Sequence, residues 1–228
     1  MPYIFTCEHG GNHVPVRFRS LFEGREKILN SHRGWDPGAL QLARASIREC
    51  PAQLFFSETT RLLIDLNRSV HHRSLFSELT RDVHEGIKKD ILDDHYYPYR
   101  DRVEHAIRAL KSRPVIHLSF HSFVPELHGV VRKGDIGLLY DPARHMEREF
   151  CLGLQSSLKQ CFPELVIRRN YPYRGIADGF TRYLRGRFSE RRYLGIEIEV
   201  NQHHVFSNGE VWNALKGRLG ALLREQNA

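Results

Sequence analysis

Apolar positions along the chain follow two spacings, which together predict an alternation of strands and helices. Short, nearly continuous apolar runs bounded by polar or turn residues are typical of buried strands. Such runs predict strands at 3–5, 53–57, 62–66, 115–120, 135–140, 165–168 and 193–200. Apolar residues three or four positions apart are typical of amphipathic helices. This spacing predicts helices at 36–49, 83–111, 144–161, 179–188 and 209–226, with a break or kink at Pro98.

The order of these elements favours an α/β fold. Strands separated by helical segments usually form a mostly parallel sheet with helices on both of its faces. The length of 228 residues suits one domain of this class, so we expect a single α/β domain over 1–228. Asp36 is a suitable N-cap for the first helix, and Pro37 suits its first turn.

The composition is that of a globular protein with a hydrophobic core. Apolar residues make up 41% of the chain and charged residues 27%. No apolar run reaches the roughly 18 residues of a membrane span, and the first residues do not resemble a signal peptide. The four cysteines are scattered without a CxxC pair, which indicates reduced thiols. We therefore expect a cytoplasmic protein that does not bind membranes.

The net charge of +7 allows several kinds of anionic partner. The 34 Lys and Arg residues are spread along the chain, and the densest group, at 182–192, is interleaved with Tyr183, Leu184 and Phe188. This pattern favours a solvated basic face over a nucleic-acid groove, so we do not expect nucleic acid as a partner. It is also compatible with a pocket for a small acidic molecule.

Three predicted strands end in residues that can bind a metal or move a proton. These are His9, His121 and Glu197, and Asp36 adds a carboxylate at a helix start. The carboxyl ends of parallel strands share one edge of a sheet, so these side chains can converge there. Two histidines and one carboxylate are a usual set of protein ligands for a catalytic zinc with an open position. A further carboxylate can then serve as general base.

Two neighbouring acids compete for the role of general base. Glu197 and Glu199 are two residues apart in an apolar strand, so both project from the same face. Either acid could serve as the general base, and the spacing alone leaves this choice open. His117 lies deeper in its strand than His121, so we expect a packed or hydrogen-bonded histidine there. Gly10 and Gly11, beside His9, are expected to leave room for a metal or substrate.

Several basic and polar residues are candidates for substrate contacts. Asn67 and Arg68 follow the predicted strand at 62–66, and Arg174 follows an aromatic loop. An arginine presents a planar fork that suits a carboxylate, although a surface ion pair is an equally simple role for Arg68. Arg61 is expected to be structural or to support the site from behind. Three further histidines are expected at the surface or behind the site: His13, His71 and His72.

Six segments in order give the sequence a resemblance to a known family. They are Cys7-Glu8-His9-Gly10-Gly11-Asn12-His13-Val14-Pro15, Asp36 with Gly38-Ala39, Thr60-Arg61-Leu62-Leu63-Ile64-Asp65-Leu66-Asn67-Arg68, His121-Ser122-Phe123, Asn170-Tyr171-Pro172-Tyr173 and Gly195-Ile196-Glu197-Ile198. In order and spacing they resemble the N-formylglutamate amidohydrolase family. The resemblance implies a phosphorylase/hydrolase-like fold, related to zinc carboxypeptidases and zinc peptidoglycan amidases, and a zinc-dependent amide hydrolase.

The resemblance also implies roles for individual residues. His9, Asp36 and His121 would be the zinc ligands. Asp36 could instead only cap its helix, in which case Glu8 would replace it as a ligand. Glu197 matches the general base of the family. Family members often carry Arg two residues after that acid, where this chain has Glu199, so the exact substrate is open.

The resemblance implies hydrolysis of the formyl amide of an acidic amino acid by a water activated at zinc. Arg68, with Asn67, would steady the oxyanion or a substrate carboxylate, and Ser122, Arg174 and Glu199 would line the substrate site. One alternative is a peptide or peptidoglycan amidase with the same zinc core. Another, of a different class, is a basic nucleic-acid-binding protein on a decayed hydrolase fold, which would not need the acids and histidines at the strand ends.

Overall fold

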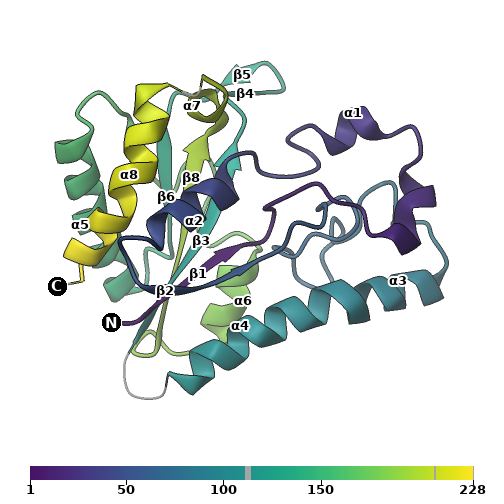
Figure 1. The fold of residues 1–228 in the computed structure, drawn as a ribbon. Coiled ribbons are helices and arrows are strands. Elements are labelled where there is room, and N and C mark those ends of the chain that lie inside the picture. Colours follow the sequence, from purple (N-terminus) through teal and green to yellow (C-terminus); the bar gives the residue numbers. More distant parts are fainter. Residues whose placement is uncertain (111–113, 208, 228) are drawn as a thin grey trace.

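The computed structural model describes residues 1–110, 114–207 and 209–227, and its centre is a six-stranded sheet (Figure 1). The strands lie in the order β2-β1-β3-β8-β6-β7. In chain order the elements are β1 (Tyr3–Cys7), η1 (Val16–Phe22), α1 (Glu26–Leu29), α2 (Ala39–Ser46), β2 (Ala52–Phe56), α3 (Glu85–Ile91), η2 (Leu92–Tyr96), α4 (Tyr97–Ala109), β3 (Val115–Phe123), β4 (Glu126–Leu127), β5 (Val130–Val131), β6 (Ile136–Leu139), α5 (His145–Cys161), β7 (Ile167–Arg169), α6 (Phe180–Arg187), β8 (Tyr193–Asn201), α7 (Gln202–Ser207) and α8 (Glu210–Glu225).

The sheet is mixed but mostly parallel, as the sequence predicts. Strands β2, β1, β3 and β8 run parallel to one another, β6 is antiparallel to β8, and β7 is parallel to β6. In the long β3–β8 pair, Ser119 lies opposite Glu197 and His121 lies opposite Glu199. This register brings two of the predicted site strands together along their whole length.

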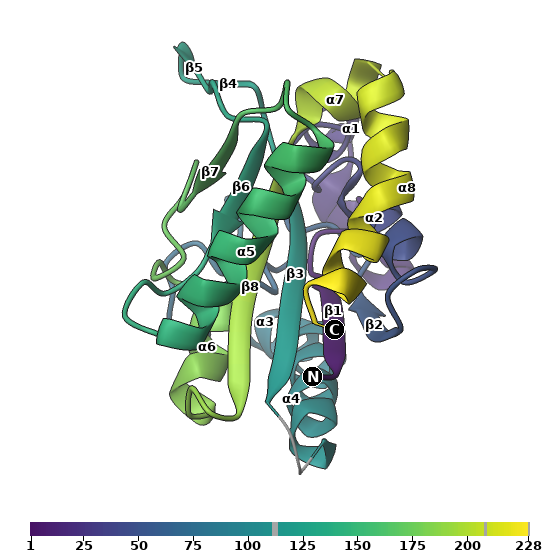
Figure 2. The ribbon, with the colours of Figure 1, turned by 90° about the vertical axis from the view of Figure 1, so that its left-hand side faces the viewer.

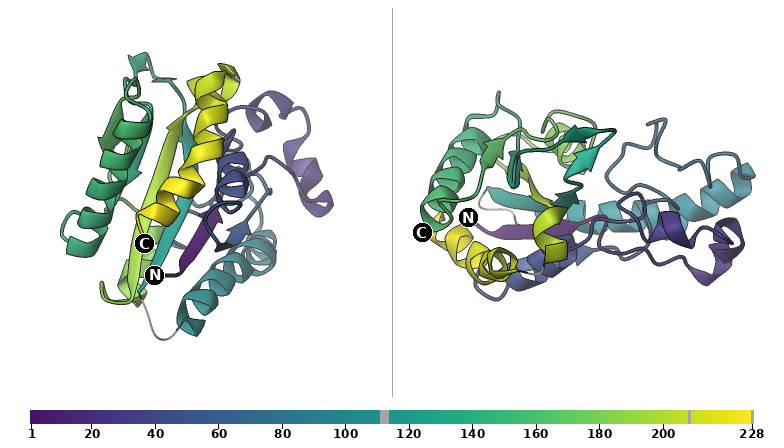
Figure 3. Two further views of the ribbon diagram at one scale, coloured as in Figure 1. Left: turned by 60° about the vertical axis from the view of Figure 1, so that its left-hand side comes forward. Right: turned by 90° about the horizontal axis from the view of Figure 1, so that it is seen from above.

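Helices cover both faces of the sheet. Helices α2, α5 and α8 pack on one face, where Figure 2 shows α5 and α8 crossing the strands. Helices α4 and α6 pack on the opposite face with the connection between β2 and α3. The segment with η1, α1 and α3 extends to one side of the sheet (Figure 3). None of the helices over the described residues has the length and apolar content needed to cross a membrane.

The two faces of the central strands differ sharply in polarity. Successive side chains of a strand point to opposite faces. In β3, Leu118 and Phe120 point into the core under α5 and α8, whereas His117, Ser119 and His121 lie on the other face and are also buried. The sheet therefore carries a buried polar row toward the end of its parallel strands.

The prediction of a strand at 62–66 is wrong. The segment is buried but folds into turns, and strand β2 occupies the edge beside β1. The hydroxyl of Thr80 donates to the carbonyls of Leu62 and Leu63 at 3.3 and 3.1 Å. Side chains thus satisfy backbone groups that a sheet ladder would otherwise pair. The apolar run at 62–66 is thus explained by burial, and it does not form a strand paired with the sheet.

The predicted helical stretch at 83–111 is helical in three consecutive parts. Helix α3 passes into the π-helical turn η2 and then into α4, with Pro98 in the first turn of α4. Proline lacks the backbone N–H that an α-helical hydrogen bond needs. The predicted break at Pro98 thus corresponds to the π-helical turn η2, which lies directly before the start of α4. Lys111, the predicted end of the stretch, lies outside the described residues. The short elements η1, α1, β4, β5 and α7 were not predicted.

His117 is a packed, hydrogen-bonded histidine, as expected. Its Nε2 lies 2.7 Å from Thr6 Oγ1, and its Nδ1 lies 2.7 Å from the Tyr193 hydroxyl. Burial lowers the pKa of His117 to about 4, and the positive charges of Arg185 and His121 add to the effect. The neutral ring therefore links three strands of the sheet beneath the polar row.

Truncation of the core at Phe5 should destabilise the protein strongly. Phe5 is fully buried in β1, and its ring packs edge-on against Phe120 at a centroid distance of 5.1 Å. Phe5→Ala is expected to lower the free energy of unfolding by about 3–5 kcal/mol, because it leaves a cavity in a closed core. Val16→Ala, at a side chain that is 71% exposed, is the control and should change it by less than about 0.5 kcal/mol. Urea unfolding followed by circular dichroism measures both. A loss below about 1 kcal/mol for Phe5→Ala would contradict this packing.

His117 should make the stability fall in mild acid. Its pKa is about 4 in the folded chain and about 6.5 in an unfolded one, so only the unfolded chain gains this proton as the pH drops between those values. The contribution is present above pH 6.5 and is lost toward pH 4, at up to about 1.4 kcal/mol per pH unit. His117→Gln should flatten this part of the stability curve, whereas His145→Gln, at an exposed ring, should not. Equal slopes for wild type and His117→Gln would show that His117 is protonated in the fold.

Candidate functional site

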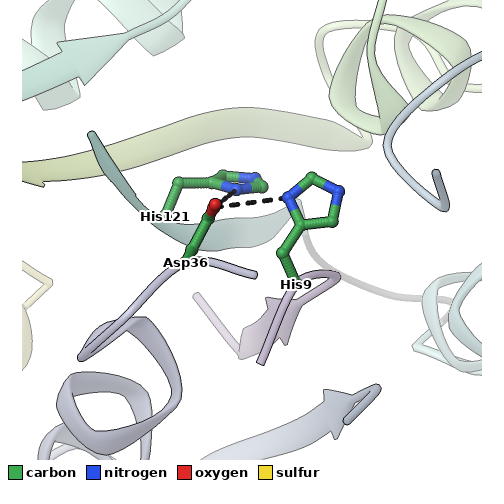
Figure 4. Close-up of side chains that lie close together, drawn as sticks. All are labelled: His9, Asp36 and His121. Atoms are coloured by element: carbon green, nitrogen blue, oxygen red, sulfur yellow. Dashed lines mark hydrogen bonds and ion pairs between the residues drawn. The ribbon is translucent and has the colours of Figure 1, made fainter. Parts of the chain in front are cut away.

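Two histidines and an aspartate from three distant segments meet at the carboxyl end of the parallel strands. His9 follows β1, Asp36 precedes α2, and His121 lies in β3. Asp36 Oδ2 lies 3.3 Å from His9 Nδ1 and 2.9 Å from His121 Nδ1, and Figure 4 shows both rings facing that oxygen. All three side chains are buried, and one ligand atom from each lies within 4.8 Å of the others. The group could therefore hold a metal ion.

Asp36 faces the histidines and does not cap α2. The helix begins at Ala39, its N-cap residue is Gly38, and no side chain makes a capping hydrogen bond there. The backbone N–H of Asp36 donates to the carbonyl of His9 at 2.9 Å. This bond fixes the two segments against each other, so that the carboxylate points at the imidazoles.

The two glycines after His9 make room for the chain itself. A Cβ at Gly10 would lie 2.9 Å from the carbonyl oxygen of Ser57, and one at Gly11 would lie 2.7 Å from that of Glu58. Real Cβ atoms do not approach so closely, so the segment after β1 can pass beside the segment after β2 only with glycine here. The expected space for a metal or substrate lies elsewhere, on the Nδ1 sides of the histidines.

Each histidine has a carboxylate behind it. Asp65 Oδ1 lies 2.7 Å from His9 Nε2, and Glu8 Oε2 lies 3.3 Å from His121 Nε2. The Ser119 hydroxyl lies 2.8 Å from the same nitrogen of His121 and donates to Glu8. A histidine whose Nε2–H donates to such a partner presents the lone pair of Nδ1 to a metal. Glu8 thus lies behind His121, outside the group around Asp36.

Asp65 is the residue of this arrangement that the sequence reasoning missed. It lies in the apolar run at 62–66, where an acid is costly unless it has a partner. An acid at this position in an apolar run therefore indicates a buried partner, and this was the evidence in the sequence for a role of Asp65. Arg61 joins the arrangement by donating to Asp65 Oδ2 at 2.8 Å and to Asp36 Oδ1 at 3.2 Å. Arg61 is therefore structural, as expected, but it connects two acids of the site.

The site is electrostatically suited to a cation. Burial alone would raise the pKa of Asp36, but His9, His121 and Arg61 hold it well below its ordinary range. Burial alone would lower the pKa of His121, yet the carboxylates of Asp36 and Glu8 raise it far above its ordinary value. The carboxylates therefore stabilise positive charge at the position between the two rings.

The two acids of β8 differ in their surroundings. Glu197 Oε1 accepts a hydrogen bond of 2.6 Å from Thr181. Glu199 Oε2 is buried and has no hydrogen-bond partner among the described residues. Burial, followed by the negative charges of Asp36 and Glu197, raises the pKa of Glu199 to about 8. A buried carboxyl oxygen without a partner is costly, so it is an available contact for a ligand.

All nine residues predicted for the site line one cavity of about 160 Å³ over the His9–Asp36–His121 group. They are His9, Asp36, Asn67, Arg68, His121, Ser122, Arg174, Glu197 and Glu199. The lining also includes Arg61, Leu139, Tyr173, Ala177 and Asp178, of which only Arg61 was considered from sequence. His13, His71 and His72 are not among the lining residues.

Three of these residues hold the walls of the cavity in place. Arg68 Nη1 donates to the carbonyl of Asp178 at 2.7 Å, and Asn67 Oδ1 accepts from the backbone N–H of Phe180 at 2.7 Å. The Ser122 hydroxyl donates to the carbonyl of Pro37 at 2.7 Å. These bonds tie together the segments that surround the histidines.

Arg174 differs because its guanidinium is exposed at the rim and has no hydrogen bond or ion pair within the part of the chain that the structure describes. Its loop follows β7 and crosses close to β6. A Cβ at Gly137 of β6 would lie 1.8 Å from the carbonyl oxygen of Tyr171. The close approach places Tyr173 and Arg174 over the cavity with a free guanidinium.

Comparison with known proteins adds a family and a fold. The family model described as N-formylglutamate amidohydrolase matches residues 1–205. The crystal structure of gene product Atu2144 from Agrobacterium tumefaciens is similar with a TM-score of 0.81 and 28% identity, over 99% of this chain and 90% of that one. No curated protein matches.

Two amidase structures show weaker similarity. The N-acetylmuramoyl-L-alanine amidase AmiC2 of Nostoc punctiforme has a TM-score of 0.40 and 8% identity, over 99% of this chain and 96% of that one. The CwlD amidase from Clostridioides difficile, in complex with the GerS lipoprotein, has a TM-score of 0.43 and 11% identity, over 99% and 98%. Because the family model spans most of the sequence and includes every residue that lines the cavity, this chain belongs to the N-formylglutamate amidohydrolase family.

Proposed function

We propose that the protein is a zinc-dependent hydrolase that cleaves the amide bond of an N-formyl or N-acyl amino acid similar to N-formylglutamate. Membership of the family supports a hydrolase of amides. The observation that carries the proposal is the buried group of His9, Asp36 and His121 at the base of a cavity that also holds two acids. We further propose that the chain acts as one domain over 1–228, in the cytoplasm, on a small acidic molecule.

The donor set fits zinc. His9, Asp36 and His121 would hold the ion, since two imidazoles and one carboxylate are typical protein ligands of a catalytic zinc with an open position. Asp65 and Glu8 support this choice, because they lie behind the two rings and orient their Nδ1 atoms. When bound, the ion supplies Lewis-acid polarisation of the scissile carbonyl and lowers the pKa of a water molecule.

Glu197 is the preferred general base. Its carboxylate lines the cavity, and the hydrogen bond from Thr181 fixes Oε1, which leaves Oε2 to accept a proton. In this role it accepts a proton from the attacking water and passes it to the departing nitrogen. Glu199 is the alternative, because its unpartnered Oε2 is also available beside the histidines.

Arg174 is the preferred contact for a substrate carboxylate. Its guanidinium is free at the rim, whereas Arg68 and Asn67 are engaged with the segment before α6. A free planar fork can bind a carboxylate with two hydrogen bonds. Arg68 and Asn67 would then act mainly by holding the wall in position, and Ser122 by holding the segment before α2.

The metal test is a direct one. The purified protein should contain about one zinc per chain, since the group offers one set of three donors. His121→Ala should lose most of this zinc, and His117→Ala, which changes a histidine outside the group, should retain it. Metal analysis by mass spectrometry after dialysis measures the content. Full hydrolytic activity in protein stripped of metal would rule out the proposed chemistry.

The assignment of the acids can be tested with two matched variants. Glu197→Gln should retain zinc and lower kcat for N-formyl-L-glutamate by about a hundredfold or more, because it removes the proton acceptor. Glu199→Gln should retain most of the turnover and mainly change KM. Steady-state kinetics across N-formyl and N-acyl amino acids, with metal analysis of each variant, measures these effects. A larger loss of kcat for Glu199→Gln would reverse the two roles, and absence of hydrolysis by wild type would refute the substrate class.

A further inference from the structure

A second hollow adjoins the catalytic cavity. Its volume is about 380 Å³, and Arg61 lines both spaces. The Arg61 guanidinium is fixed between them, because one nitrogen bonds to Asp36 and another to Asp65. The two hollows therefore meet at the Arg61 side chain, which is 25% exposed, and an extended molecule whose reactive end lies at the histidines would reach the second hollow across it.

The second hollow has a positive lining. Arg33, Arg61, Arg73 and Arg81 face it, against the acids Asp65 and Glu78. Three of these arginines already form ion pairs. Arg61 pairs with Asp36 and Asp65 of the site, Arg33 pairs with Glu78, and Arg81 pairs with its neighbour Asp82.

Arg73 is the available cation of this lining. It is exposed and makes no hydrogen bond or ion pair with any residue that the structure describes. The pKa of His32, also in the lining, is lowered by burial and then by the charges of Arg33 and Arg61. The lining thus holds four arginines against two acids, with Arg73 unpaired among the described residues, and this charge balance favours an anion.

The rest of the lining is suited to an aliphatic linker. Leu62 is buried and Phe76 is half-buried, and both contribute apolar surface. The hydroxyl of Ser74 adds a polar group beside Arg73. The apolar side chains can contact the methylene groups of a ligand whose carboxylate lies at Arg73. An inorganic ion would leave these apolar contacts unused.

We propose that this hollow is a second anion subsite, which binds a carboxylate carried on an aliphatic extension of the substrate. Arg73 binds that carboxylate, Arg81 adds positive charge beside it, and Leu62 and Phe76 contact the chain that leads to it. The inference rests on the proposed function in one respect, namely that the amide end of the molecule lies at His9, Asp36 and His121. It extends the substrate class to N-acylated amino acids with a distal carboxylate beyond the reach of the first cavity.

Equilibrium binding of molecules without an amide tests the subsite independently of hydrolysis. Azelate carries a carboxylate at each end of its chain, and nonanoate has the same length with one carboxylate. Isothermal titration calorimetry of the zinc-loaded wild type at low salt should show azelate binding about tenfold more tightly than nonanoate, because only azelate places a second charge beside Arg73. The double variant Arg73→Ala/Arg81→Ala should lose this preference.

A charge-matched control excludes a general effect of net charge. Arg48→Ala/Arg218→Ala removes two exposed arginines from the part of the molecule near α2 and within α8, and it should keep the preference for azelate. Equal binding of the two probes by wild type, undetectable binding of both, or a preference that survives in Arg73→Ala/Arg81→Ala would each overturn the subsite. A preference for azelate without hydrolysis of any N-acyl amino acid would instead keep the subsite and refute the proposed function.

Discussion

The carboxylate of Asp36 is buried between two imidazoles and one guanidinium, and the site depends on this arrangement. An isolated charge in a protein interior costs several kcal/mol, and Asp36 lies among four other buried acids, Glu8, Asp65, Glu197 and Glu199. The contacts with His9, His121 and Arg61 offset that cost. The same contacts fix both rings with one nitrogen toward a common point. Charge compensation and ligand orientation are thus achieved by one set of bonds.

The sheet makes this arrangement possible by bringing distant segments together. Strands β1 and β3 are parallel neighbours, so the residues that follow or end them, His9 and His121, lie on the same edge. Strand β8 is the next neighbour and adds its two acids on the same face. The face under α5 and α8 is apolar, whereas the opposite face carries both a second apolar cluster under α4 and α6 and, toward the carboxyl end of the strands, the buried polar row. The polar groups of the site are therefore confined to one face of these strands, toward their carboxyl ends.

Sequence reasoning recovered most of the fold because periodicity reports burial and spacing directly. It placed the long strands β3 and β8 and the helices α5 and α8 within a few residues. It failed at 62–66, where an apolar run is buried in turns whose carbonyls bond to side-chain hydroxyls, because periodicity does not record such bonds. The residues predicted for the site line one cavity, and for His9, His121 and Glu197 the reason is that the ends of neighbouring parallel strands share an edge; their catalytic roles stay a prediction. Asp65 was missed because its role depends on a contact with His9, which is 56 positions away.

Gly137 has a consequence for how substrate preference can diverge among related chains. Because Gly137 has no side chain, the crossing loop can lie directly against its backbone, and that loop carries Tyr173 and Arg174 over the cavity. A methyl group at this position would displace the loop and move a guanidinium that is many residues away. Selectivity can therefore shift through a change in the sheet at a residue outside the cavity lining, while the histidines stay in place. The same change would also press on Glu199, whose Cβ would lie 3.3 Å from the new one. The parts of the molecule that recognise a substrate and those that react with it can in this way evolve separately.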